Sequence, residues 1–496
     1  MACAPDTPPF PPTHDPELFR EAGHLLVDRL ADYLRTVAGR DRLLSWREPP
    51  ETLHAFLEEL PREGVPEGRR AGELVRLLGD LFVESSMHMH HPLYLGHQVA
   101  VPVVAAALAD LAVSFLNPSQ AIFEISPGAN AIETVLIRWM AGLIGFDERA
   151  DGLVLSGGSV ANLTALLAAR NRFLGAEVFR AGVRGEALAI LVSADHHYSI
   201  ARAAMILGIG KDGVIPVPID AWRRMVPAGI EGAARTASSR GRRPFALCAT
   251  AGSTPIGAFD PLAEAAAEAR RLGLWLHVDA AHGGAALLSG EHRGKLAGID
   301  QADSVTWDPH KTMLMPGGLG TVILRDGQKL IDAFHQDAPY LFDAHHPELA
   351  QLDIAKKAIP CTKRADCVKL WACLKVFGAD CFARLYEGCC ATARLLYEKL
   401  RAAPDFETIH EPESNILCFR HVPAALQGSG AAAIDRHNAA LRSAVVRDGR
   451  AYLTPGRLDG RDVLRVVIMN PVTGGVHVDR LIGILRELGA RAAPVP

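Results

Sequence analysis

The chain has 496 residues, of which 49% are hydrophobic and 22% are charged, and its formal net charge is −4. This balance is typical of a globular protein, and the length predicts two to four domains with cores large enough to need no disulfides. The charge gives no electrostatic reason to expect a nucleic acid or an anionic membrane as a partner.

The N-terminal segment 1–15 is rich in proline and predicts a flexible arm, without the basic segment and apolar core of a signal peptide. The longest apolar stretch, 99–113, is shorter than the roughly 20 residues that a membrane-spanning helix needs. We expect it to form a buried helix, and we expect no membrane partner.

The nine cysteines include no CxxC pair, and their spacings match no zinc ribbon or finger. They predict reduced, mostly buried thiols in a cytoplasmic protein. The cluster His88-Met-His-His91 resembles a metal site, but no second cluster of suitable spacing accompanies it. No metal is therefore expected.

Apolar residues recur at helical spacing from Asp15 onward, and the stretches 72–83 and 131–145 also predict helices. From about residue 150, short apolar runs alternate with Ala-rich helical stretches. This alternation predicts an α/β fold with a mostly parallel sheet that is covered on both faces. The predicted strands are 153–155, 188–192, 245–250, 274–278, 304–307 and 320–324, and the predicted helices between them are 160–173, 200–207 and 261–272.

After residue 366 the pattern changes to two long helices, 367–377 and 379–402, followed by strands at 416–420 and 463–469. This order predicts a smaller α+β domain at the C-terminal end.

Three of the predicted strands end at residues that can bind a ligand or take part in a reaction, and they are described in chain order. The strand 153–155 leads into Ser156-Gly-Gly158-Ser159 and then a helix, which aims backbone N–H groups and a helix dipole at an anion such as phosphate. The strand 188–192 is followed by Asp195-His196-His197, where an imidazole can stack on a ring or simply belong to a polar loop. The strand 274–278 ends in Asp279, whose carboxylate can keep a pyridine nitrogen protonated or can cap the next helix.

The strongest segment is 304–311, SVTWDPHK, a strand followed by Lys311 and an apolar, Gly-rich stretch. Apolar flanks desolvate an amine and lower its pKa, as a Schiff-base lysine requires. The alternative for an isolated lysine here is a surface residue after a turn.

Together and in this order, these segments resemble the group II pyridoxal-phosphate (PLP)-dependent amino-acid decarboxylases of fold type I. The resemblance extends from about His91 to Leu488. It includes further matches at 91–96, 249–254, 337–341 and 464–471. It implies a large PLP-binding domain at 96–365 with a seven-stranded sheet, an N-terminal arm and helices at 1–95, and a small domain at 366–496.

The resemblance also implies roles for individual residues and a cofactor, pyridoxal 5'-phosphate. Lys311 is similar to the lysine that holds the cofactor, Asp279 to the partner of the pyridine nitrogen, and Tyr340 to a loop tyrosine that closes over the neighbouring subunit's site in a homodimer. Arg465 matches an arginine that meets a substrate carboxylate in the glutamate branch, and a structural role is an equal alternative. The remaining implied cofactor contacts are the stacked His197, Ala281 beneath the ring, Thr250 near it, and the phosphate ligands Gly158, Ser159, Ser304 and His310.

One departure concerns Asp308, where the family often has asparagine. A carboxylate near the phosphate repels it unless the carboxylate is turned away or protonated.

The implied activity is decarboxylation of an L-amino acid to an amine and CO2, with catalysis by Lys311, Tyr340, His197 and Asp279. The segments 197–199, 340–342, 356–364 and 369–371 resemble the acidic and diaminobutyrate branch more than the aromatic branch, and they favour a small polar or acidic substrate, such as glutamate, aspartate, cysteine sulfinate or 2,4-diaminobutyrate. The alternatives are an oxidative deaminase or aldehyde synthase, an aromatic amino-acid decarboxylase, and an inactive homologue that serves as a binding subunit.

Overall fold

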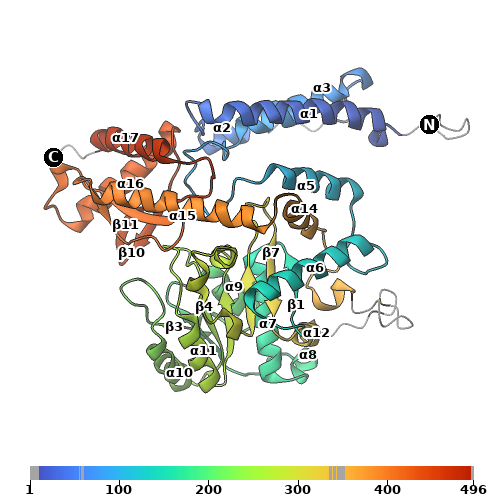
Figure 1. Cartoon of the computed structure of the whole chain (residues 1–496), viewed down its shortest axis with the longest axis vertical. Helices are drawn as coiled ribbons and strands as arrows, with labels where there is room; N and C mark the ends of the chain where they lie inside the picture. Colours follow the sequence, from blue (N-terminus) through green and yellow to red (C-terminus); the bar gives the residue numbers. More distant parts are fainter. Residues whose placement is uncertain are drawn as a thin grey trace, which may run out of the picture.

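A seven-stranded sheet forms the centre of the protein (Figure 1). The computed structural model describes residues 11–54, 56, 61–334, 338, 342 and 352–492. The strand order is β1-β7-β6-β5-β4-β2-β3, and every neighbouring pair is parallel except those that involve β7. The predicted α/β class and the mostly parallel sheet are therefore confirmed. The strands are β1 (Asp151–Leu155), β2 (Leu188–Ser193), β3 (Val214–Val217), β4 (Arg243–Thr250), β5 (Trp275–Asp279), β6 (Ser304–Trp307) and β7 (Gly320–Leu324).

Both faces of the sheet are buried, because successive strand residues point to opposite sides. In β5, for example, Leu276 and Val278 belong to one apolar cluster and Trp275 belongs to the other. The first face is covered by α6 (Pro127–Ile144), α10 (Ile230–Ser239), α11 (Leu262–Arg271) and α14 (Cys367–Phe377). The second is covered by α7 (Gly158–Leu174), α9 (Tyr198–Ile206) and α12 (Gln328–Phe334).

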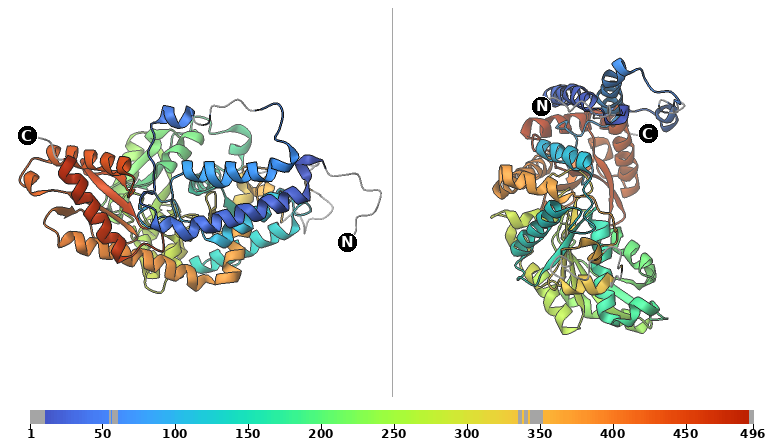
Figure 2. Two further views of the ribbon diagram at one scale, coloured as in Figure 1. Left: turned by 90° about the horizontal axis from the view of Figure 1, so that it is seen from above. Right: turned by 90° about the vertical axis from the view of Figure 1, so that its right-hand side faces the viewer.

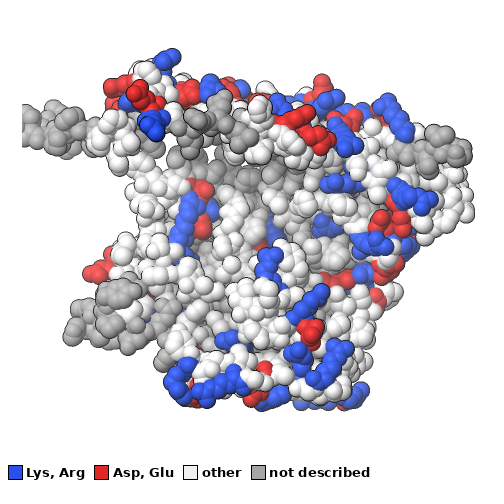
Figure 3. Space-filling view, turned by 180° about the vertical axis from the view of Figure 1, so that it is seen from behind, with Lys and Arg blue, Asp and Glu red and all other residues white. Residues whose placement is uncertain are grey.

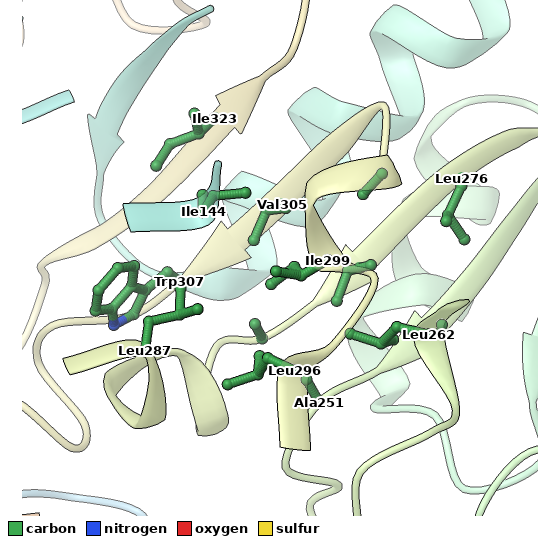
Figure 4. Packing of buried hydrophobic residues seen from close by; sticks show 14 of the residues in the cluster. Ile144, Ala251, Leu262, Leu276, Leu287, Leu296, Ile299, Val305, Trp307 and Ile323 are labelled. Atoms are coloured by element: carbon green, nitrogen blue, oxygen red, sulfur yellow. The ribbon is translucent and has the colours of Figure 1, made fainter. Parts of the chain in front are cut away.

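The end of β6 is anchored by Trp307, whose side chain is fully buried. Figure 4 shows its indole beside Leu287, below Val305 of the same strand and Ile323 of the neighbouring β7. A Cβ at Gly284 would lie 2.5 Å from this indole, so only glycine fits there. This packing fixes the point at which the chain leaves β6 for Lys311.

A second sheet belongs to the C-terminal part and has the order β10-β11-β9-β8, all antiparallel. Three helices pack on it around a separate apolar cluster. The division into domains at 95/96 and 365/366 stays a prediction. The elements are β8 (Phe406–Thr408), β9 (Ile416–His421), β10 (Thr454–Leu458), β11 (Arg461–Val467), α15 (Ala379–Arg401), α16 (Ala431–Asp448) and α17 (Gly475–Ala492).

The N-terminal helices form a layer at one end of the molecule, where α1 and α3 lie side by side (Figures 1 and 2). Asp15 caps α1 by accepting a hydrogen bond from the backbone N–H of Glu17. The remaining α-helices in the first half of the sequence are α1 (Pro16–Thr36), α2 (Pro49–His54), α3 (Arg70–Val75), α4 (Val83–Ser85), α5 (Val104–Leu116) and the short α8 (Glu177–Ala181).

The prediction of a buried helix at 99–113 is half wrong. The helix exists as α5, but of its thirteen residues only Ala106 and Val113 are buried, while Leu108 and Phe115 are exposed in this single chain. Among the described residues, no helix is both long and apolar enough to cross a membrane. The eight described cysteines are all free, and six of them are buried.

Charged side chains of both signs are interspersed on the face shown in Figure 3. Many of them form exposed ion pairs of low individual value. Arg223 is different. It is only 15% exposed and donates two hydrogen bonds to Asp195 (2.6 and 2.7 Å), in the loop before His197, and one to Asp459 (2.7 Å) of the small sheet's hairpin. Its φ of +61° is a strained conformation that these bonds maintain.

We expect Arg223→Ala to lower the free energy of unfolding by about 3 kcal/mol, because the substitution leaves the buried Asp195 carboxylate unpaired. Arg224→Ala is the control, since Arg224 is 40% exposed and pairs with Glu413. Its expected effect is below about 1 kcal/mol. Thermal and urea unfolding of both variants measure the difference. Equal effects would show that the Arg223 pair is no stronger than a surface pair.

Candidate active site

A cavity of about 600 Å³ opens at the carboxyl ends of the parallel strands, where ligands of open α/β sheets bind. Nine of the sequence-predicted site residues line it. Tyr340 lies outside the described residues. The nine residues are Gly158, Ser159, His197, Thr250, Asp279, Ala281, His310, Lys311 and Arg465.

Ser304 is the exception, and its predicted role as a phosphate ligand needs correction. It lies at the start of β6, away from the strand's carboxyl end, is fully buried, and does not line the cavity. Its hydroxyl accepts a hydrogen bond from the indole N–H of Trp275 (2.8 Å) and lies 2.9 Å from Nδ1 of His277. Ser304 therefore orients other side chains.

Asp279 ends β5 and lies in register with Thr250 of β4. Its Oδ2 accepts a hydrogen bond from Nδ2 of Asn162 (2.9 Å), and its Oδ1 accepts one from the backbone N–H of Ala281 (3.1 Å). Asn162 is held in turn by Nε2 of His277, 2.9 Å from its Oδ1. Burial lowers the pKa of His277 to about 4, so the imidazole is neutral and donates through Nε2.

His197 is connected to the same network through Ser199. Nδ2 of Asn162 donates to the Ser199 hydroxyl (2.9 Å), and that hydroxyl lies 2.9 Å from Nδ1 of His197. Nδ1 of His197 also accepts a hydrogen bond from the backbone N–H of Ser199 (3.3 Å), so it carries no proton; the Ser199 hydroxyl therefore donates to Nδ1, and the His197 proton resides on Nε2. Burial, foremost, lowers the pKa of His197. A neutral imidazole and a carboxylate are thus held in fixed orientation at the cavity.

The amino end of α7 forms the opposite wall. Gly157, its N-cap, has φ +135° and no side-chain cap, and a Cβ there would lie 3.2 Å from the His310 ring. A Cβ on Gly158 would lie 3.2 Å from Cβ of Ala281. His310 Nδ1 donates to the carbonyl of Leu319 (2.7 Å), which turns Nε2 towards this wall. The first turn therefore offers N–H groups and a helix dipole to an anion.

These residues fit pyridoxal phosphate. The cavity combines an amine (Lys311), a carboxylate held for a ring nitrogen (Asp279), a neutral imidazole for stacking (His197) and a glycine cradle for phosphate. Asp308 is the one discordant group, because its carboxylate faces the cradle.

A model of the pyridoxal-dependent decarboxylase conserved domain matches residues 76–422 of the sequence. The chain belongs to the pyridoxal-dependent decarboxylase family. Its cofactor is pyridoxal 5'-phosphate, and its reaction class is that of the carboxy-lyases.

Known proteins agree with this assignment along nearly the whole chain. The decarboxylase is 32% identical to mouse (Mus musculus) cysteine sulfinic acid decarboxylase, over 95% of this chain and 96% of that protein. It is 34% identical to an acidic amino acid decarboxylase of Bos taurus, over 82% and 77% of the two chains. The crystal structure of mouse CSAD in apo form superposes with a TM-score of 0.87 at 31% identity, over 95% of this chain and 98% of that one.

Several residues that the structure brings to the decarboxylase site have no role predicted from the sequence. Asn162 lies one helical turn after Ser159, and this spacing alone predicts that both face the sheet edge. His97 and Gln98 directly follow the run 91–96, and His282 directly follows Ala281, so proximity to matched segments was the available signal. Within the described residues, no group of three or more His, Cys, Asp or Glu is arranged to hold a metal.

Asn162→Ala is expected to lower cofactor affinity about tenfold or more, because one hydrogen bond to a charged group contributes about 1.5–3 kcal/mol. The substitution removes the hydrogen bonds that Asn162 donates to Asp279 and to Ser199, so that neither Asp279 nor the Ser199–His197 pair is held in its orientation. Titration of the cofactor-free enzyme with PLP, followed by absorbance, measures the affinity. Asn171→Ala is the matched control, since this second buried asparagine of α7 donates to the carbonyl of Ala333 (2.9 Å), away from the cavity. A similar loss in both variants would contradict a role for Asn162 in positioning Asp279.

Proposed function

We propose that this enzyme decarboxylates a small L-amino acid whose side chain ends in a carboxylate or a sulfinate. Arg465 carries the proposal. Its guanidinium lines the same cavity as Lys311, and the residue is only 8% exposed. It donates hydrogen bonds to neutral oxygens only: the carbonyls of Thr254 (2.6 Å) and Pro255 (3.0 Å) and the hydroxyl of Thr454 (3.4 Å).

No carboxylate of the described residues forms an ion pair with Arg465, and burial lowers the pKa of this guanidinium. A buried cation without a counter-charge is costly and favours an anionic ligand. An acidic side chain supplies that anion, whereas the ammonium of 2,4-diaminobutyrate would be repelled.

The surroundings of Arg465 support an anion as well. Burial, foremost, and the charges of Lys311 and Arg465 lower the pKa of His282 to about 3, so this imidazole is neutral. Gln98 lines the same cavity, and its Nε2 is buried with no hydrogen-bond partner among the described residues. A carboxylate or sulfinate can accept from both Arg465 and Gln98.

When bound, pyridoxal phosphate supplies the sink for the electrons that remain on Cα after CO2 leaves. The chain's own residues prepare this step. Lys311 holds the cofactor and is exchanged for the substrate amine, Asp279 keeps the ring nitrogen protonated, and Arg465 orients the substrate by its distal acid. Tyr340 is proposed to return a proton to Cα, which favours an amine product over an aldehyde.

A substrate panel tests the proposal. The enzyme is supplied with PLP and each of L-aspartate, L-glutamate, L-cysteine sulfinate, L-2,4-diaminobutyrate and L-tryptophan, and CO2, amine, aldehyde and peroxide are quantified. We expect CO2 and amine in equal amounts from one or more acidic substrates. Turnover of tryptophan or diaminobutyrate alone would overturn the substrate class. Aldehyde and peroxide in place of amine would assign the enzyme to the oxidative branch.

We also propose that the enzyme is a cytoplasmic homodimer with sites shared between subunits. The N-terminal helices and α5 expose large apolar side chains that a second copy can cover, among them Phe19 and Phe115, whose ring centroids lie 4.7 Å apart. Light scattering of the purified protein tests the dimer, and a monomer of full activity would contradict it.

A further inference from the structure

Asp308 occupies the end of the glycine cradle. It follows Trp307 in the turn that leads to Lys311, and its side chain is 1% exposed. Its Oδ2 accepts a hydrogen bond from the backbone N–H of Gly158 (2.9 Å), the first residue of α7. Asp308 thus already uses one of the N–H groups that the cradle offers to an anion.

The Asp308 carboxylate has little room to turn away. A Cβ on Gly320 would lie 2.3 Å from Oδ1, and a Cβ on Gly158 would lie 2.8 Å from Oδ2, so two glycine backbones enclose the group. The backbone N–H of Asp308 donates to the carbonyl of Ala281 (3.2 Å), which fixes the turn. Oδ1 is buried and has no hydrogen-bond partner among the described residues. A buried acceptor without a donor is costly when charged.

The ionisable groups of Lys311, His310 and Asp279 act on Asp308. Nζ of Lys311 lies 3.6 Å away and Nε2 of His310 lies 3.8 Å away, and both favour the ionised carboxylate, as does the Gly158 N–H. Burial and the Asp279 carboxylate oppose them. Burial is the largest influence, and the pKa of Asp308 is raised. A phosphate dianion in the cradle is a second negative neighbour of Asp308. It also partly offsets the influence by which Lys311 and His310 favour the ionised Asp308 carboxylate.

We propose that Asp308 binds the cofactor phosphate as a carboxylic acid, so that cofactor binding takes up one proton from solvent onto its Oδ1. The proton neutralises a buried Oδ1 that has no donor to stabilise its charge, and it removes the repulsion between carboxylate and phosphate. The inference rests on the proposed placement of phosphate at the amino end of α7. It makes Asp308 a pH-dependent cofactor ligand.

The direction of the pH dependence follows from linkage. Above the pKa that Asp308 has in the cofactor-free enzyme, binding must first add a proton, and affinity falls by up to about tenfold per pH unit. Asp308→Asn is nearly isosteric and needs no proton, so its affinity lacks this decline. The cofactor therefore binds more weakly to the unmodified enzyme than to Asp308→Asn at high pH.

Calorimetry with pyridoxine 5'-phosphate tests the inference, because this analogue has the ring and phosphate but no aldehyde with which to bond Lys311. Titrations at pH 6–9 in buffers of different ionisation enthalpy give both affinity and proton uptake. We expect the unmodified enzyme to take up close to one proton more than Asp308→Asn. Asp303→Asn is the matched control, because Asp303 is also a mostly buried carboxylate of raised pKa but lies at the opposite edge of the sheet. It should behave as the unmodified enzyme.

A second measurement needs no variant. Pyridoxine without phosphate should bind the unmodified enzyme without the additional proton. Equal proton uptake for both ligands, or parallel pH profiles for the enzyme and Asp308→Asn, would overturn the inference and leave the proposed activity intact. Failure of pyridoxine phosphate to bind at any pH would overturn the phosphate placement itself, and the inference with it.

Discussion

Lys311→Ala is expected to abolish decarboxylation, with kcat lowered by roughly a thousandfold or more, because the lysine both holds the cofactor and exchanges it with substrate. The purified variant should also lack the visible absorption of lysine-bound cofactor. Lys311→Arg separates charge from chemistry, since arginine keeps a cation beside Asp308 but cannot form a Schiff base. Both variants are expected to be equally inactive.

Lys329→Ala is the control for Lys311. This lysine lies on α12, is 32% exposed, and pairs only with Asp326 and Asp332 among the described residues. It should retain both the absorption and the activity. Full activity of Lys311→Arg would contradict covalent attachment at this position, whatever the spectrum of Lys311→Ala.

The sequence pattern was most informative where strands are short, apolar and bounded by Gly or Asp. The predicted strands 304–307 and 320–324 agree with β6 and β7 at both ends, and the helix 367–377 agrees with α14. The strand β3 was not predicted, because Pro216 interrupts its apolar run and because, as the edge strand, it has only one neighbour. The helix α10 was missed because its buried side carries one large apolar residue, Ile230, and otherwise only alanines.

The candidate site was predictable for residues that lie directly at strand ends or helix starts. Asp279 is the last residue of β5, and His197 and Lys311 follow β2 and β6 within a few residues. Parallel strands bring their carboxyl ends to one edge. Ser304 was misplaced because a motif gives the order of residues along a strand but not which end faces the ligand. Asn162 and His277 could not be assigned from the sequence, since their roles depend on hydrogen bonds between segments more than 100 residues apart.

The role of Arg465 could not be decided from the sequence, for a different reason. Sequence alone left a structural arginine and a substrate-binding arginine as equal alternatives. The neutral partners Thr254, Pro255 and Thr454 favour the substrate-binding role that we propose, because an arginine retained only for structure inside a protein is usually paired with a carboxylate. Under this proposal, the cationic charge of Arg465 is left for a ligand.

Arg465→Ala is expected to reduce kcat/KM for the acidic substrate by two orders of magnitude or more. Truncating one partner of a buried, hydrogen-bonded charge pair costs about 2–5 kcal/mol. The loss should lie mainly in KM if the arginine binds the distal acid equally in the ground state and the transition state. Arg465→Lys should retain part of the substrate affinity, because the positive charge remains while the planar guanidinium, which can donate two parallel hydrogen bonds, is lost. Steady-state kinetics with the best acidic substrate measures both effects.

Arg457→Ala is the matched control, since this arginine of β10 lies in the same sheet but is 71% exposed and pairs only with Asp462 among the described residues. It should leave kcat/KM unchanged. The decisive comparison uses two substrates, one with a distal acid and one with an amide in its place, such as L-glutamate and L-glutamine. If Arg465 recognises the acid, its removal lowers kcat/KM for the acid far more than for the amide, and the preference between them narrows. If Arg465 only supports the backbone at Thr254 and Pro255, both substrates lose equally, and cofactor affinity and thermal stability fall together with them.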